Sequence, residues 1–240
     1  MRVLHTNITI KPPAGLRGLS RDDMALQFDY ANARHIVLTD PSASWGMGAE
    51  AAAQTLQKLR AEVSVRTSSL PTAPELLEQL SLTAAEEVSA ANDDADTLFS
   101  ATLLSIQDHS LTCAWAGDIL AAVFSPRAGA RWINHPNYSG AKDSESWPVR
   151  AKPASWYPGL LGCTRAQRAN ALLEHAPTIT LAQDELVVVL SSDLWTRLSS
   201  DVLESVMRVQ PRDRVHEELV ARAEAAGAKS FRCVASAWRD

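Results

Sequence analysis

The stretch HIVLTDPSASWGMGAEAAAQTLQKL (residues 35–59) carries the strongest fold signal in this chain. Apolar, strand-forming residues at 36–39 lead directly to a carboxylate, Asp40. A loop with two glycines follows, and a pattern of strong helix formers begins at Gly48. A carboxylate at the end of a strand can present a ligand to a metal or a substrate, and it can equally cap the next helix. Asp40 is therefore the first candidate site residue.

Strand patterns on both sides of this stretch predict antiparallel sheets. Apolar residues that alternate with small or polar ones are typical of half-buried strands. Strand-like runs occur at 35–39, 97–106, 110–116, 119–125, 130–134, 185–191 and 231–238, and several of them alternate in this way. Short turns at 107–110 and 117–118 separate the central runs, so we expect residues 97–125 to form an antiparallel meander.

Helical patterns occur in two pairs, at 48–63 with 72–92 and at 199–209 with 213–228. Pairs of helices between groups of strands favour an α+β fold over repeated βαβ units. We therefore expect a single domain, residues 1–240, built as a two-layer antiparallel β-sandwich flanked by helical pairs (α-β-β-α). Each pair of helices would cover one face of the sandwich.

Composition excludes several classes of function. The 240 residues carry a net charge of -5 and 46% hydrophobic residues, as in an ordinary globular protein, and no basic run predicts a nucleic-acid partner. The apolar runs are too short to span a bilayer and the N-terminus lacks a signal-peptide core, so we expect no membrane partner and a cytoplasmic location. Three widely spaced cysteines argue against a zinc cluster or a disulfide framework.

Other carboxylates also lie next to strands. Asp22 and Asp23 precede the alternating stretch MALQF, Asp193 follows ELVVVLSS, and Asp118 lies in the turn AGD. Hard divalent cations prefer carboxylate oxygens, so carboxylates gathered at one end of a sandwich could hold such ions. Aspartate is also a common turn and N-cap residue, which is the simpler interpretation of each one alone, and of Asp118 in particular.

The order of these features is more specific than any one of them. Six segments follow one another along the chain: SRDDMALQF, VLTDPSASWGMGAEAA, SATLLSI, CAWAGDILAAVF, GLLGC and LAQDELVVVLSSDLWTRLSSDVL. In this order they resemble the acidic N-terminal, Asp-Gly, Gly-Thr-Thr-Leu, Val-Gly-Asp-Ser, Leu-Gly and Ser-Asp-Gly-Leu motifs of the type 2C (PPM) metal-dependent serine/threonine phosphatases. The resemblance spans nearly the whole chain and implies the PPM phosphatase-like sandwich.

The resemblance also implies an activity and a metal centre. In that family, water activated by two divalent cations, Mn²⁺ or Mg²⁺, attacks a phosphoserine or phosphothreonine. Asp40 would bridge the cations, the backbone carbonyl of Pro41 would be a second ligand, and Asp193 would hold one cation. The partner would be a phosphoprotein substrate or a signalling protein.

Residues near the N-terminus would complete this centre. By the same resemblance, Asp23, with Asp22 beside it, would hold metal-bound waters. Arg17 or Arg21 would grip the phosphate, because a guanidinium can bind it through two hydrogen bonds. The implied catalytic residues are thus Asp40, Asp193 and Asp23.

Departures from the family pattern keep a second interpretation open. Pro41 and Leu194 stand where the motifs have glycine, and the closing Asp-Asn pair is replaced near Ser230 and Phe231. The loss of one carboxylate ligand should weaken at least one cation. The alternative is a pseudophosphatase that acts as a binding or regulatory module, with the irregular segment 135–160 as the first candidate for partner contact.

Other enzyme classes fit the sequence less well. The segment VLTDPSAS suggests the aspartate nucleophile of haloacid-dehalogenase enzymes, but that mechanism needs a second aspartate where Ser42 stands. No GxSxG motif occurs, and the six histidines show no ligand-type spacing. We interpret the histidines as surface or packing residues.

Overall fold

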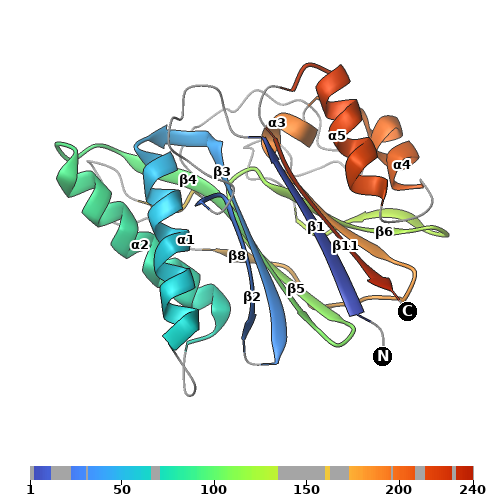
Figure 1. Ribbon diagram of the computed structural model, residues 1–240, viewed down its shortest axis with the longest axis horizontal. Coiled ribbons are helices and arrows are strands. Elements are labelled where there is room, and N and C mark those ends of the chain that lie inside the picture. Colours follow the sequence, from blue (N-terminus) through green and yellow to red (C-terminus); the bar gives the residue numbers. More distant parts are fainter. Residues whose placement is uncertain are drawn as a thin grey trace.

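The fold is a sandwich of two antiparallel sheets with helices on both outer faces (Figure 1). This computed structural model describes residues 3–11, 23–30, 32–65, 71–134, 160–162, 173–195, 197–208, 214–228 and 231–239. The α-β-β-α architecture predicted from the sequence is confirmed. None of the helices in these ranges is long and apolar enough to cross a membrane.

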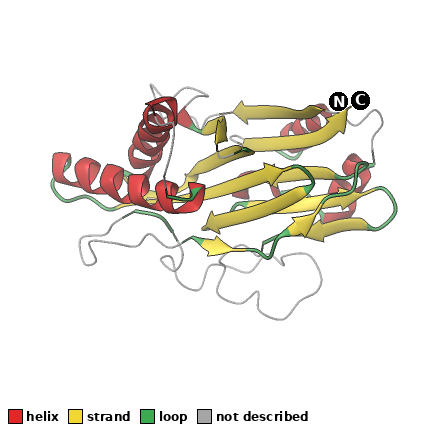
Figure 2. Cartoon of the chain, turned by 90° about the horizontal axis from the view of Figure 1, so that it is seen from below, coloured by secondary structure: helices red, strands yellow, loops and turns green. Residues whose placement is uncertain are grey.

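Each sheet combines strands from distant parts of the chain. The first, here called the β1 sheet, has the order β1 (Val3–Lys11), β11 (Phe231–Arg239), β10 (Leu186–Leu190), β6 (Leu120–Ser125) and β7 (Gly129–Trp132). The second, the β3 sheet, has the order β2 (Ala25–Tyr30), β3 (Ala33–Gly46), β4 (Thr97–Gln107), β5 (Ser110–Ala116) and β8 (Glu174–His175), and β9 (Ile179–Thr180) also pairs with β5. The first and last strands pair antiparallel, so the two chain ends meet at one corner (Figure 2).

The helices divide between the two outer faces as the sequence predicts. The long helices α1 (Gly48–Val65) and α2 (Ala73–Ala91) cover the β3 sheet, and α4 (Ser200–Met207) and α5 (Val215–Ala225) cover the β1 sheet (Figure 1). A short helix, α3 (Ser192–Trp195), follows β10. A capping box begins α2: the Thr72 side chain accepts from the Glu75 N–H, and the Glu75 carboxylate accepts from the Thr72 N–H at 2.7 Å.

The alternation of side chains along the strands creates three apolar layers. In β3, Val37 packs under α1 and α2, whereas Ile36 and Leu38 enter the layer between the sheets. In β10, Val188 packs under α4 and α5, whereas Val189 enters the same central layer. Because both faces of these strands are covered, they are apolar at nearly every position.

One predicted connection is wrong. The sequence suggested that the 117–118 turn continues a single meander, but β5 belongs to the β3 sheet and β6 to the β1 sheet. The chain therefore crosses from one sheet to the other at Gly117. Gly117 has a φ of +84°, and a Cβ at this position would overlap the side chain of Ser100. Only glycine suits both the backbone conformation and this close approach.

Strand β3 is longer than predicted. The glycine-containing segment after Asp40 was expected to be a loop, yet the strand extends to Gly46. Its pairing with β4 shifts register between Asp40 and Trp45. Such a bulge bends a strand and re-aims its side chains, and bulges are common beside functional sites. Strands β1 and β2 were also absent from the predicted set of strands.

His35 is a buried polar residue at the β2–β3 hairpin. It is 5% exposed and stacks on Phe28, with 5.0 Å between the ring centres. Nε2 lies 3.0 Å from the Tyr30 carbonyl and Nδ1 lies 2.8 Å from Ser105 Oγ. Because a carbonyl can only accept, Nε2 carries the proton and Nδ1 accepts from the Ser105 hydroxyl. The prediction that this histidine is a packing residue is confirmed.

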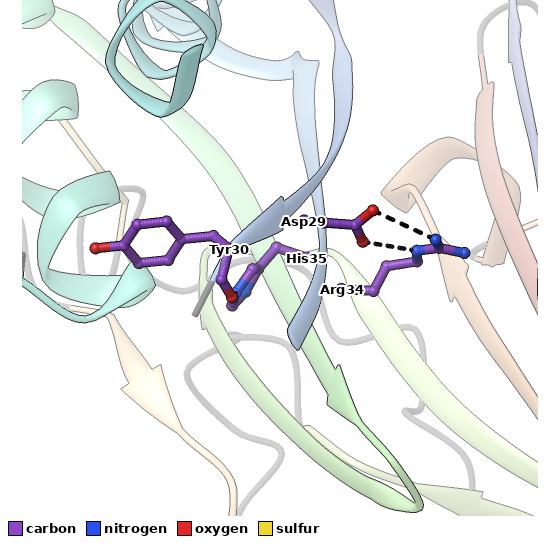
Figure 3. Close-up of polar contacts among 4 residues, drawn as sticks. All are labelled: Asp29, Tyr30, Arg34 and His35. Carbon is purple, nitrogen blue, oxygen red and sulfur yellow. Dashed lines mark hydrogen bonds and ion pairs between the residues drawn. The ribbon is translucent and has the colours of Figure 1, made fainter. Parts of the chain in front are cut away.

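Burial lowers the pKa of His35 below its usual value of 6.5. The hydrogen bond to the Tyr30 carbonyl and the negative charge of Asp29 both raise the pKa of His35, but their effects are smaller than that of burial. Asp29 is itself paired with Arg34 at 3.0 Å beside the hairpin (Figure 3).

Folding stability should therefore decrease as the pH falls below 6.5. The unfolded chain takes up a proton on His35 before the folded chain does, so the contribution of the neutral ring is complete above 6.5. It is lost as the pH falls toward the lower pKa of the folded state. Urea unfolding at about pH 7.5 and about pH 5.5 should show a larger drop in unfolding free energy for the wild type than for His35→Gln. Equal drops in the two proteins would contradict this assignment.

Candidate functional site

Asp40 lies buried at the end of the layer between the two sheets. It shares the strand face of Ile36 and Leu38, and its side chain is 0% exposed. Its Oδ2 accepts the backbone N–H of Ser192 at 3.0 Å and the Ser192 hydroxyl at 3.1 Å. Since Ser192 is the first residue of α3, this carboxylate connects the β3 sheet to the segment that follows β10.

A second polar contact lies beside Asp40. Ser100 of β4 is the direct pairing partner of Asp40 across the two strands. Its hydroxyl donates to Asp118 Oδ1 at 2.9 Å and accepts the Asp118 N–H at 3.4 Å. Asp118 was interpreted as a turn residue, and it does lie in a turn, but its carboxylate also fixes the crossing between the sheets.

Trp195 closes the network from the other side. Its ring Nε1–H donates to the backbone carbonyl of Asp118 at 2.8 Å. The side chain is 1% exposed and packs with the apolar cluster under α4 and α5. The end of α3 is therefore tied to the sheet crossing, while its beginning is tied to Asp40.

The other acidic candidates lie near this end of the sandwich. Asp193 follows Ser192 in α3, so its backbone lies next to the Asp40 carboxylate, although its side chain lies outside the described set. Asp23 directly precedes Met24, whose carbonyl accepts the Thr39 N–H at 3.0 Å beside Asp40. One oxygen of Asp23 accepts from Gln57 of α1 at 3.1 Å.

Several predicted site residues cannot be placed. Arg17, Arg21, Asp22 and Ser230 lie outside the described residues, as does most of the 135–160 segment. The backbone of Pro41 belongs to β3 at the start of the bulge, and its carbonyl stays a predicted ligand.

The Asp40 carboxylate is chemically suited to a hard divalent cation. Both lone-pair positions of Oδ2 accept hydrogen bonds from Ser192. A cation held here would draw on the Asp40 carboxylate, with the Pro41 carbonyl and Asp193 as predicted ligands beside it. Among the described side chains, no three acidic, histidine or cysteine groups gather around one point.

Comparison with known proteins identifies the fold. No protein-family model and no curated protein matches the chain. Solved structures do match: a serine/threonine phosphatase of S. agalactiae at 14% identity, 98% coverage of each chain and a TM-score of 0.69. The catalytic domain of the serine/threonine phosphatase PstP, solved with two manganese ions, matches at 11% identity, full coverage of both chains and a TM-score of 0.68. PppA, a regulatory component of T6SS in Pseudomonas aeruginosa, matches at 15% sequence identity with a TM-score of 0.65, and the match covers both chains in full.

The chain thus has the fold of the type 2C (PPM) serine/threonine phosphatases, and the resemblance inferred from its motifs is confirmed at the level of fold. No pattern in the sequence predicted that Ser192, Ser100 and Trp195 belong to the network around Asp40. A serine and a tryptophan near a strand end carry no local signal for such contacts, because their partners are distant in the sequence.

Replacing Trp195 by Phe should destabilise the fold more than the same change at Trp115. Trp195→Phe leaves the Asp118 carbonyl without its indole donor, which should cost about 1–3 kcal/mol of unfolding free energy. The Trp115 Nε1 is buried without a hydrogen-bond partner among the described residues, so Trp115→Phe removes a similar volume and no such bond. Urea unfolding of both variants measures the difference. A Trp115→Phe loss as large as that of Trp195→Phe would contradict the proposed role of the indole.

Proposed function

We propose that this chain hydrolyses phosphoserine or phosphothreonine in a protein substrate, with one Mn²⁺ or Mg²⁺ held by Asp40 and Asp193. The observation that carries the proposal is the position of Asp40, buried where β3 ends its regular pairing and in contact with the residue before Asp193. The phosphatase fold of the chain supports the same conclusion. The manganese ions in the PstP structure support the choice of metal.

The predicted site residues would have distinct tasks in this reaction. The cation would supply a water of lowered pKa and would neutralise charge on the phosphoryl group. Asp40 would hold the cation, while Ser192 orients its carboxylate through two hydrogen bonds to Oδ2. The Pro41 carbonyl and Asp193 would complete its protein ligands.

The remaining predicted residues would act around the cation. Asp23, with Asp22, would accept hydrogen bonds from waters and orient them for attack on phosphorus. Arg17 or Arg21 would grip the phosphoryl oxygens of the substrate. The contacts of Ser100 and Trp195 with Asp118 would keep this end of the sandwich rigid during the reaction.

A regulatory binding module is the second candidate function. The two hydrogen bonds that Asp40 Oδ2 accepts from Ser192 favour it, because they satisfy this oxygen of the buried carboxylate without a cation. The replacement of the closing carboxylate near Ser230 favours it as well. In that case the chain would bind a phosphoprotein or signalling partner without hydrolysis.

Asp40→Asn should abolish hydrolysis if the chain is an enzyme. The measurement is release of phosphate from a phosphothreonine peptide with millimolar Mn²⁺, and kcat should fall about a hundredfold or more because charge stabilisation at the cation is lost. Asp108→Asn is the matched control, since Asp108 lies in the exposed β4–β5 turn with a φ of +51° that asparagine also tolerates. The control should retain wild-type activity.

Two outcomes would count against the enzyme. If wild type and Asp40→Asn release phosphate at the same slow rate, Asp40 holds no catalytic cation. If the wild type is inactive but binds the phosphopeptide, the binding module is the correct function. Circular dichroism of each variant verifies that the fold is intact in these comparisons.

A further inference from the structure

We infer that Gln57 of α1 is a positioning residue for Asp23, an inference that rests on the proposed function. The side-chain amide of Gln57 donates a hydrogen bond to Asp23 Oδ1 at 3.1 Å. In the proposed reaction the Asp23 carboxylate accepts hydrogen bonds from metal-bound waters, so its orientation decides where those waters lie. Gln57 would set this orientation without touching the cation or the substrate.

The backbone that follows Asp23 is already fixed by strand β3. The N–H and the hydroxyl of Thr39 both donate to the carbonyl of Met24, at 3.0 Å and 3.3 Å. Met24 and Thr39 are fully buried, so these bonds are shielded from water. They hold the residue after Asp23 against the residue before Asp40, but they do not act on the Asp23 side chain.

Gln57 reaches the carboxylate itself from a rigid element. Its neighbours Leu56 and Leu59 are fully buried in the apolar cluster between the β3 sheet and its helices, so α1 cannot shift without disrupting close packing. The Gln57 side chain is exposed and adds little to that packing. Its hydrogen bond to Asp23 is therefore a contact that the core of the protein does not require.

The polar side chain next to Gln57 has a different partner. Lys58 Nζ forms an ion pair with Glu87 of α2 at 2.9 Å, between side chains that are both partly exposed. This pair joins the two helices, whereas the Gln57 contact joins α1 to the residue that precedes Met24. The two neighbouring positions thus serve different contacts.

Steady-state kinetics on a phosphothreonine peptide with Mn²⁺ should compare wild type, Gln57→Met, Gln57→Lys and Gln79→Met. Gln57→Met keeps the length of the side chain and removes the donor, so kcat should fall about tenfold with KM unchanged. Gln57→Lys keeps an N–H donor of similar reach and should retain more of kcat than Gln57→Met. Gln79→Met is the matched control, because Gln79 is exposed on α2, and it should keep wild-type kinetics.

NMR of the side-chain amides tests the contact without any activity measurement. The Gln57 amide signal, identified by its absence in Gln57→Met, should shift when Mg²⁺ is added, because it senses the cation through Asp23. The shift should disappear in Asp23→Asn. The amide signal of Gln79 should not respond to Mg²⁺ in any of these proteins.

The outcomes separate this inference from the proposed function. Hydrolysis with the same kcat in wild type and Gln57→Met, or a Gln57 amide that does not respond to Mg²⁺, would overturn the role of Gln57 and leave the proposed hydrolysis intact. A loss of kcat that Gln57→Lys shares in full would also overturn it, because the donor would then not matter. No hydrolysis and no Mg²⁺ response in the wild type would overturn the proposed function, and the inference with it.

Discussion

The contact between Asp40 and Ser192 is the constraint on which this end of the molecule depends. A fully buried carboxylate is costly unless hydrogen bonds replace its water, and here a backbone N–H and a hydroxyl do so at one oxygen. The carboxylate belongs to the β3 sheet, whereas its donors begin the helix that follows β10 of the β1 sheet. Satisfying this one group therefore requires both sheets and α3 to be in register at the same end of the sandwich.

Further hydrogen bonds surround the contact between Asp40 and Ser192. Trp195 and Ser100 both bind Asp118, so the sheet crossing, β4 and α3 form a frame around the Asp40 carboxylate. Such a frame can hold a metal ligand in one orientation, which is the condition for an efficient metal site.

Local patterns predicted most of the fold, and non-local contacts account for what they missed. The apolar run at 185–191 and the helix formers after Gly48 are properties of neighbouring residues, and both elements lie where the sequence predicts them. The glycine at 117 predicts a turn. Whether the chain then returns to the same sheet or crosses to the other depends on packing against distant residues, which the local sequence does not show. The motif order pointed to Asp40, whereas the donor role of Ser192 arises from a contact 152 positions away in the sequence. The roles of Asp193 and the arginines remain predictions.

The most direct test of this account is a crystal structure of the chain grown with Mn²⁺ and measured with anomalous scattering from manganese. The expected result is manganese bound at the Asp40 carboxylate, with Asp193 beside it and the Ser192 N–H still bonded to Asp40. Manganese bound only at a distance from Asp40 would contradict the metal site itself.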